Sequence, residues 1–329
     1  MTADGTTAQT FALIIPTHGR PEFVVQAVRS ALRQERAFDR VIVIPDGLED
    51  PASDALAGLD VDVHPVPHAG VAAARNAGLA LADTDWVCFL DDDDLLHPSY
   101  LGDLEAAIGQ YPEAGAFNAP YWSFGTEIGA REEFAAETLD ECLAAIETAL
   151  PRNDMTYLDI TGRSFDALLG GLAGSMSTAA VRTETLRAAG GFPDGLIAAE
   201  DWTMYVNVAR FTEWRVLGER RAFFRDHGGN AMRGRSTAKG LSALRAIRSF
   251  WQPTELPTPP HRPIGAYSRG YRHEVLAALA ACARNDDPGG RRVALRIASE
   301  ILPRRWDRVF VRMPRPIRSA MWRLEGVAS

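Results

Sequence analysis

Short apolar runs alternate with amphipathic segments through the first third of the chain. Residues 11–15, 40–44 and 86–90 are compact runs dominated by β-branched and aromatic side chains, which is typical of strands buried on both faces. Between them, apolar positions recur at helical spacing over residues 21–32 and 70–81. Strands that alternate with helices across short loops predict an α/β fold of the doubly wound type, with a mostly parallel sheet and helices on both faces.

The pattern beyond residue 90 extends this fold and then changes character. We expect further helices at 51–59, 98–111, 135–150, 183–189 and 199–211, and further strands at 61–66, 114–122, 175–181, 214–217 and 221–225. Five prolines within residues 251–263 predict an extended linker, and helices are expected after it at 271–283 and 291–302. We therefore predict a catalytic α/β domain over residues 1–235 and a helical extension over residues 236–329.

The composition is that of an ordinary globular protein. Of the 329 residues, 46% are hydrophobic and 24% are charged, and no stretch approaches the roughly 20 apolar residues that span a bilayer. The first nine residues lack the basic start and apolar segment of a signal peptide. The three cysteines, Cys88, Cys142 and Cys282, are far apart and form no metal-binding or disulfide spacing, so we expect a reducing, cytoplasmic location.

Four consecutive carboxylates, Asp91 to Asp94, follow the third buried run directly. We call these four residues the acid run. Like charges at close range are costly unless cations hold them, and hard oxygen ligands suit Mg²⁺ or Mn²⁺. The acid run therefore predicts a metal site that can also hold substrate phosphates; a solvated acidic turn is the alternative.

Polar loops also follow the first two buried runs, at residues 17–20 and 46–47. In open α/β sheets ligands bind beyond the carboxyl ends of the strands, so we expect these loops and the acid run to converge on one crevice. The first strand is not followed by Gly-x-Gly-x-x-Gly, and the chain has no Gly-x-x-x-x-Gly-Lys-Ser/Thr. This argues against dinucleotide-binding and P-loop proteins.

Five segments occur in the order of one known family. Residues 12–20, Ala-Leu-Ile-Ile-Pro-Thr-His-Gly-Arg, and 41–47, Val-Ile-Val-Ile-Pro-Asp-Gly, resemble the opening nucleotide-binding segments of family 2 glycosyltransferases. Residues 70–78, Gly-Val-Ala-Ala-Ala-Arg-Asn-Ala-Gly, are similar to a helix start of that family. The acid run is similar to its Asp-x-Asp motif, and residues 200–202 to its Glu-Asp motif. The resemblance covers about residues 10 to 235 and implies the GT-A fold.

The resemblance implies a nucleotide site built from the loops that follow the strands. The residues matched to it are Pro16, Thr17, Arg20, Asp46, Arg75, Asp91 and Asp92. The Thr17 loop and Asp46 would contact the base, where a carboxylate accepts a hydrogen bond from a ring N–H. Arg75 would face the nucleotide or its diphosphate, and Asp91 would lie near the ribose. For Arg75, an ion pair on the surface of a helix is the structural alternative.

The resemblance also implies cation-binding and catalytic residues. Asp93 would bind a divalent cation, Mn²⁺ or Mg²⁺, with Asp92 as the alternative ligand because the register of a four-residue run is open by one. His227 would be a further ligand; a surface histidine in a glycine turn is the alternative. Asp201 would be the general base for the acceptor hydroxyl and Glu200 the second choice. Both acids also suit simple capping of a helix, whose dipole favours them in its first turn.

These matches imply an inverting, metal-assisted glycosyltransferase. Its donor would be a nucleoside-diphosphate sugar, preferably a UDP-sugar, and its acceptor the hydroxyl of a glycan, a lipid-linked molecule or a natural product. At Pro45 the chain departs from the family, which usually has a second acid there. Two alternatives are a sugar nucleotidyltransferase, which normally has a Gly-rich, basic loop that is missing here, and a catalytically inactive protein that binds nucleotide sugars or metal.

Basic residues gather at the end of an acidic chain. From His261 onward there are 14 arginines against 6 acids, whereas the whole chain carries a net charge of −8. This tail, with its interspersed tryptophans, predicts either peripheral contact with an anionic membrane at its inner face or a helical appendage that packs on the protein with arginines in solvent. We expect no nucleic-acid partner, because the rest of the chain is acidic.

Overall fold

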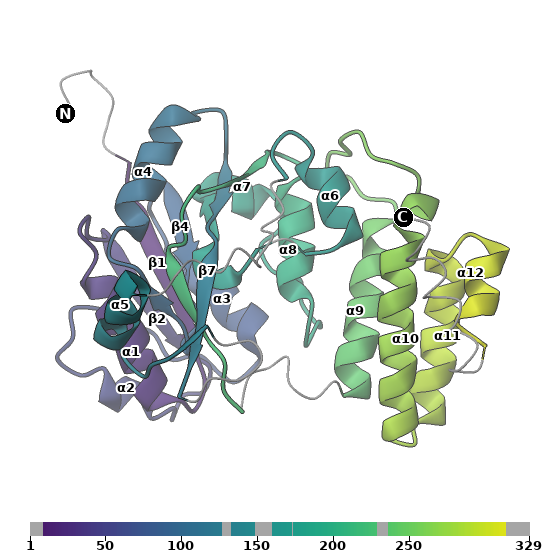
Figure 1. The fold of residues 1–329 in the computed structure, drawn as a ribbon, viewed down its shortest axis with the longest axis horizontal. Coiled ribbons are helices and arrows are strands. Elements are labelled where there is room, and N and C mark those ends of the chain that lie inside the picture. Colours follow the sequence, from purple (N-terminus) through teal and green to yellow (C-terminus); the bar gives the residue numbers. More distant parts are fainter. Residues whose placement is uncertain (1–8, 127–132, 149–159, 173, 229–235, 314–329) are drawn as a thin grey trace. The chain divides into compact units, whose positions relative to one another are not determined.

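The computed structural model describes residues 9–126, 133–148, 160–172, 174–228 and 236–313 (Figure 1). The chain forms two compact units: residues 1–164, 173–194 and 207–231 belong to the first, and residues 165–172, 195–206 and 232–329 to the second. Two segments that precede the predicted division at residue 235 thus belong to the second unit. The end of the expected 135–150 helix and the basic tail beyond residue 313 lie outside the described residues.

A seven-stranded sheet, in the order β10-β6-β9-β4-β1-β2-β3, organises the first unit. Its strands are β1 (Phe11–Thr17), β2 (Arg40–Pro45), β3 (Asp62–Val63), β4 (Trp86–Phe89), β6 (Ala116–Asn118), β9 (Ala180–Arg182) and β10 (Trp214–Val216). β1 pairs in parallel with β2 and β4, β2 with β3, and β6 with β10. Only β9, among these described strands, runs antiparallel to its neighbours. The predicted α/β fold with a mostly parallel sheet is confirmed.

Helices cover both faces of this sheet, as the period of the strands requires. Phe11, Leu13 and Ile15 of β1 pack into one buried cluster with residues of α1 (Pro21–Leu32) and α4 (Tyr100–Gln110). Successive strand residues point to opposite faces, so Ile14 faces the other side, where α3 (Val71–Leu81) lies. A Cβ on Gly78 of α3 would stand 2.5 Å from Ile14 Cγ2, so this close approach needs glycine.

A smaller sheet shows that one strand prediction is wrong. It has the order β5-β11-β7-β8, formed by Leu95–Leu96, Ala222–Arg225, Tyr121–Gly125 and Phe134–Ala135. The expected single strand at 114–122 is two strands, β6 in the large sheet and β7 in the small one. Pro120 lies at the break and has no N–H to offer a continuous ladder. β6 then pairs with β10, while β7 pairs with β11.

Several other elements are shorter than expected, among them the strand predicted at 61–66, of which only β3 (Asp62–Val63) forms. The 175–181 strand opens as a 3₁₀ turn, Met176–Thr178, because the Ser175 hydroxyl accepts a hydrogen bond from Ser177 N and favours a turn over a ladder. The helix expected at 51–59 is only α2 (Ala52–Ala55). The remaining helices up to residue 208 are α5 (Leu139–Thr148), α6 (Ser164–Gly170), α7 (Thr183–Ala188) and α8 (Glu200–Val208).

In the second unit α9 (Thr237–Phe250), α10 (Ser268–Arg284) and α11 (Pro288–Ile301) pack side by side, followed by the short α12 (Arg305–Phe310) (Figure 1). The proline-rich segment between α9 and α10 is non-helical up to Pro263, as predicted. The sequence analysis missed α9, although Leu241, Leu244, Ile247 and Phe250 recur every three residues and are buried. Within the described residues, no helix is long and apolar enough to cross a membrane.

Candidate nucleotide and cation site

The loops after β1, β2 and β4 meet at the carboxyl edge of the large sheet, as expected for parallel neighbours. Pro16 and Thr17 are the last two residues of β1 and both are buried. The Thr17 hydroxyl donates to Asp92 Oδ2 at 2.7 Å, and Thr17 O accepts from Asp46 N at 2.8 Å. Thr17 therefore joins the loop after β2 to the acid run.

The acid run alternates between buried and accessible carboxylates. Asp92 and Asp94 are each 1% exposed. The side chains of Asp91 and Asp93 are 33% and 12% exposed. Asp94 N donates to Asp91 O at 3.1 Å, which makes the run a tight turn rather than a strand. Asp91 and Asp93 are thus the members of the run that a ligand can reach.

Guanidinium groups offset the charge of the run. Arg20 bridges two members, with Nη2 at 2.6 Å from Asp92 Oδ1 and Nη1 at 2.5 Å from Asp93 Oδ2. Arg75 donates from Nη2 to Asp91 Oδ1 at 2.7 Å. The side chain of Arg75 is only 4% exposed, so this pair is not the surface ion pair considered from the sequence. The acid run is therefore balanced by buried and half-buried arginines.

Burial dominates the protonation of the two inner carboxyls. It raises the pKa of Asp92 to about 7, with the charge of Arg20 opposing the rise in part. Burial, together with the charges of Asp93 and Asp91, also holds the pKa of Asp94 well above its usual range. Removing a carboxylate from water penalises its charged form, so the two buried carboxyls hold their protons to higher pH than ordinary aspartates do.

Asp94 is anchored by two residues that the sequence analysis did not single out. Its Oδ2 lies 2.5 Å from Ser177 Oγ, and its Oδ1 accepts from Arg225 N at 2.9 Å. Arg225 Nε also donates to Asp93 O at 2.9 Å. These contacts tie the acid run to the end of β11, two residues before His227. No local sequence signal indicates them, because the partners come from distant elements.

His227 and Asp93 converge on one point. The Nε2 atom of His227 lies 3.1 Å from Asp93 Oδ2, and its ring packs edge-on against Phe23. Ligand atoms at right angles around an octahedral ion are roughly 3 Å apart when each bond is about 2.1 Å long. The pair therefore fits two neighbouring positions around a divalent cation. His227 is not an isolated surface histidine; its side chain is 20% exposed.

The carboxylate of Asp46 is held by main-chain amides. Its Oδ1 accepts from Ala69 N at 2.8 Å and its Oδ2 accepts from Gly70 N at 3.0 Å, just where α3 begins. Gly70 has φ 94°, a conformation that favours glycine. His18 and His68 stack beside Asp46 with ring centroids 4.5 Å apart. We call His18, Asp46 and His68 the Asp46 cluster.

Glu200 and Asp201 open α8 and belong to the second unit. Glu200 is 8% exposed, and Asp201 Oδ1 accepts from Trp202 N at 2.6 Å. Trp202 itself is buried and donates from Nε1 to Leu168 O at 2.6 Å. Acids in a first helical turn are favoured by the dipole, so this position suits capping as well as catalysis. The catalytic role of either acid stays a prediction.

The fold and the carboxyl-edge site define an α/β protein of GT-A type. The crystal structure of Staphylococcus aureus TarS residues 1–349 in complex with UDP-GlcNAc has a similar fold, with a TM-score of 0.63 at 15% identity, covering 89% of this chain and 80% of that one. Residues 12–148 match the family described as "Glycosyl transferase family 2". This match includes the first three loops and the acid run.

Curated relatives share part of this region. The succinoglycan biosynthesis protein ExoW of Rhizobium meliloti is 33% identical over 121 residues, which cover 34% of this chain and 36% of that protein. An uncharacterized glycosyltransferase of Haemophilus influenzae is 28% identical over 114 residues, covering 33% and 43%. The chain thus matches less than half the length of each.

Proposed function

We propose that this protein is an inverting glycosyltransferase that moves a sugar from a nucleoside-diphosphate sugar, preferably a UDP-sugar, to an acceptor hydroxyl. The observation that carries the proposal is the network at the carboxyl edge, where Thr17 and Arg20 meet Asp92 and Asp93. The family match over residues 12–148 supports it. The solved TarS complex with UDP-GlcNAc, a protein of similar fold, is consistent with a uridine nucleotide.

We propose a role for each nucleotide-site residue. Asp46 is proposed to accept a hydrogen bond from the nucleotide base, since a carboxylate has lone pairs beyond those used by Ala69 N and Gly70 N. Asp91 is proposed to lie at the ribose. Arg20, whose side chain is 37% exposed, can turn from the carboxylates to a phosphate. Arg75 donates a hydrogen bond to Asp91 and holds its carboxylate in place.

Asp93 and His227 are the residues proposed to hold Mn²⁺ or Mg²⁺. The alternating burial of the acid run supports Asp93 over Asp92, because Asp92 is 1% exposed and is engaged by Thr17 and Arg20. Such a cation supplies Lewis-acid neutralisation of the departing diphosphate when it is bound. The chain itself contributes the anchors that keep Asp93 in position, namely Arg225 Nε on its carbonyl and Arg20 on its carboxylate.

The donor site is tested by thermal unfolding with UDP, with and without Mn²⁺. We expect UDP with Mn²⁺ to raise the melting temperature, since a ligand that binds the folded state at about 100 times its Kd adds about 2.7 kcal/mol. In Asp93→Asn, most of the increase in melting temperature should disappear, and UDP should give the same small increase with and without Mn²⁺. Asp140→Asn is the matched control, because the Asp140 carboxylate is 75% exposed and pairs with an exposed arginine that lies outside the site. Indifference of the wild type to every nucleoside diphosphate would overturn the proposal.

The proposed role of Asp201 as general base is tested by a separate measurement. Asp201 is proposed to accept the proton of the acceptor hydroxyl, so that attack comes from the opposite face of the sugar. Asp201→Asn should lower UDP release from a UDP-sugar panel by about 10²- to 10⁴-fold while the UDP-dependent thermal shift persists. Glu200→Gln should be milder. Full turnover in Asp201→Asn would move the role to another group, and loss of both readouts would point to misfolding.

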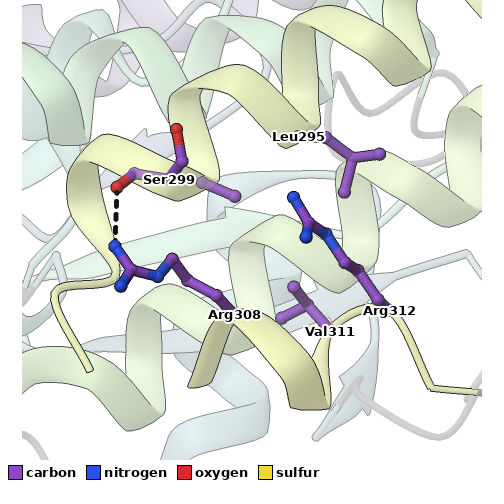
Figure 2. A pocket seen from close by; sticks show the side chains of 6 residues that line it. Leu295, Ser299, Arg308, Val311 and Arg312 are labelled. Carbon is purple, nitrogen blue, oxygen red and sulfur yellow. Dashed lines mark hydrogen bonds between the residues drawn. The ribbon is translucent and has the colours of Figure 1, made fainter. Parts of the chain in front are cut away.

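We further propose that the enzyme works at the inner face of a membrane, on a lipid-linked or other membrane-borne acceptor. In α12, Trp306 is 49% and Val309 41% exposed, and Arg304 and Arg305 beside them are exposed too. Tryptophan suits the membrane interface and arginine is drawn to anionic headgroups. Phe310 and Val311 are buried, so one side of this segment packs on the neighbouring helices, and the side with Trp306 and Val309 is exposed. Figure 2 shows Arg308 and Arg312 beside Val311.

Vesicle co-sedimentation tests this contact. Wild-type protein should sediment with phosphatidylglycerol vesicles and stay in solution with pure phosphatidylcholine. The double change Trp306→Ala and Val309→Ala should reduce the bound fraction several-fold. Ile197→Ala is the control, because Ile197 is 60% exposed in the same unit but lies on another segment. Equal binding of all three proteins, or none by the wild type, would rule out α12 as the contact.

A further inference from the structure

The Asp46 cluster has a property that nucleotide binding does not require. His18 directly follows β1, Asp46 follows β2, and His68 precedes α3. A hydrogen bond from Asp46 N to Thr17 O and a parallel bridge between Asp46 and Val66 hold the three loops in register. The two imidazoles therefore stack on loops that the sheet positions.

The nitrogen atoms of the two rings converge. His18 Nδ1 lies 2.8 Å and His68 Nδ1 lies 3.1 Å from the same atom, Asp46 O. His68 Nδ1 is also 2.9 Å from Asp46 Oδ2. One ligand atom from each of the three residues lies within 4.8 Å of the others. A carbonyl oxygen only accepts, so each Nδ1 is a donor in these contacts. A metal takes the Nδ1 lone pair of the tautomer protonated on Nε2, so binding replaces the hydrogen bonds to Asp46 O.

We propose that His18, Asp46 and His68 form a binding site for a transition metal of the Zn²⁺ type. Two imidazoles and one carboxylate are the ligands of a borderline metal, whereas the oxygen-rich acid run suits Mg²⁺ or Mn²⁺. Tetrahedral ligand atoms are about 3.3 Å apart for bonds of about 2.0 Å, so atoms that lie within 4.8 Å of one another need shifts of at most about 1.5 Å. The exposed side chains of His18 and His68, 61% and 62% accessible, are free to move this far.

The surroundings keep the ligands oriented. Ala69 N and Gly70 N donate hydrogen bonds to the Asp46 carboxylate and fix its orientation. Such outer-shell hydrogen bonds commonly orient metal-ligating groups. Asp50 Oδ2, 3.6 Å from His18 Nδ1 and held by Gly19 N, adds a second negative charge. Three protein ligands leave a further position open to water.

Occupation of this site regulates the donor site. Because Asp46 is the residue proposed to contact the base, Zn²⁺ on the Asp46 cluster excludes the nucleotide and inhibits the enzyme. This regulatory part rests on the proposed function, whereas metal binding by the cluster does not. The chain then has two cation sites. The site at Asp93 and His227 prefers Mn²⁺ or Mg²⁺ and helps to bind the diphosphate, whereas the Asp46 cluster prefers Zn²⁺ and prevents binding of the nucleotide base.

The binding part is tested on metal-stripped, untagged protein without nucleotide, by calorimetric titration with Zn²⁺ and by the absorption of bound Co²⁺. His18→Ala and His68→Ala should each weaken binding at least tenfold and lose the intense Co²⁺ bands of a four-coordinate site. His64→Ala is the matched control, an exposed histidine in the same loop, and should bind as the wild type does. His227→Ala should also retain this site. Unchanged binding in His18→Ala and His68→Ala, or a loss confined to His227→Ala, would overturn the proposal.

The regulatory part is tested by competition. Zn²⁺ at saturation should weaken UDP binding about tenfold in the wild type, and His68→Ala should remove this effect. If UDP fails to bind any form of the protein, the proposed function fails while the Zn²⁺ titration still decides the metal site. If UDP binds equally with and without Zn²⁺ in a protein that holds Zn²⁺, the exclusion of nucleotide is wrong.

Discussion

The acid run and the Asp46 cluster lie at the same sheet edge but balance their charge in different ways. The carboxylates of the acid run are neutralised by guanidinium groups of Arg20 and Arg75, which are side chains that can exchange partners. The carboxylate of Asp46 is held by the main-chain amides of Ala69 and Gly70, which lead directly into α3 and have no rotatable side chain. We infer that the acid run can exchange partners when a cation or phosphate binds, while the Asp46 carboxylate keeps its position and only the exposed histidines beside it can move.

The largest difference between the two regions should appear in their response to pH. Burial raises the pKa of Asp92 from 3.8 to about 7, so the folded protein keeps this proton when the unfolded chain has already lost it. The free energy of unfolding therefore falls as pH rises from about 4 to about 7, and this contribution is flat above. At about 1.4 kcal/mol per pKa unit, the fall is at most roughly 4 kcal/mol.

Urea unfolding at about pH 4.5 and about pH 7.5 measures this fall. Asp92→Asn should reduce the slope, because an amide does not titrate, and the part that remains should come from Asp94, whose pKa is also raised by burial. Asp140→Asn, at an exposed acid, should leave it unchanged. A wild-type slope in Asp92→Asn would show that Asp92 ionises as an ordinary surface carboxyl does, and the contrast between the two regions would lose its electrostatic basis.

Removing one guanidinium should be the next largest effect. Arg75→Met keeps the bulk of a buried side chain but leaves Asp91 without its ion pair. Loss of one partner of a buried pair costs about 3–5 kcal/mol, and the lower figure is expected because Asp91 is one-third exposed. Arg33→Met breaks an exposed pair with Asp140 and should cost less than about 1 kcal/mol. Equal costs in denaturant unfolding would contradict the buried-pair interpretation.

The Asp46 cluster should give a smaller, local effect. Asp46→Ala removes the acceptor for two amides and should cost about 1–2 kcal/mol, as the loss of a helix-capping carboxylate does. Asp46→Asn keeps one acceptor oxygen and should cost about half as much. Neither change should alter the Mn²⁺ concentration needed for nucleotide binding. If Asp46→Ala altered the Mn²⁺ requirement, the two regions would form one coupled site.

Local pattern predicted the fold where each strand is a continuous apolar run. β1, β2 and β4 lie where expected because burial on both faces leaves an unmistakable composition. The pattern failed at residues 114–122, where the apolar positions on both sides of Pro120 look alike and only the partner strands, β10 and β11, differ. It also missed α9, whose apolar spacing is present but is diluted by polar residues and an internal Gly240.

The candidate site shows the same division. Asp91 to Asp94, Thr17, Arg20 and Asp46 could be found because each follows a predicted strand. Ser177 and Arg225 could not, since they meet Asp94 across 83 and 131 residues of chain. The pairing of His18 with His68 was also hidden, because histidines in two loops carry no periodic signal.

The sequence by itself determined that buried strands end in acids and polar loops, because hydrophobic burial acts on runs of adjacent residues. The tertiary structure decided which members of the acid run are accessible and that Arg20 pairs with Asp92 and Asp93. It also brought the His227 ring next to the Asp93 carboxylate. These outcomes depend on electrostatics and desolvation between side chains far apart in the chain. Such terms are set only when the sheet brings the strand ends together.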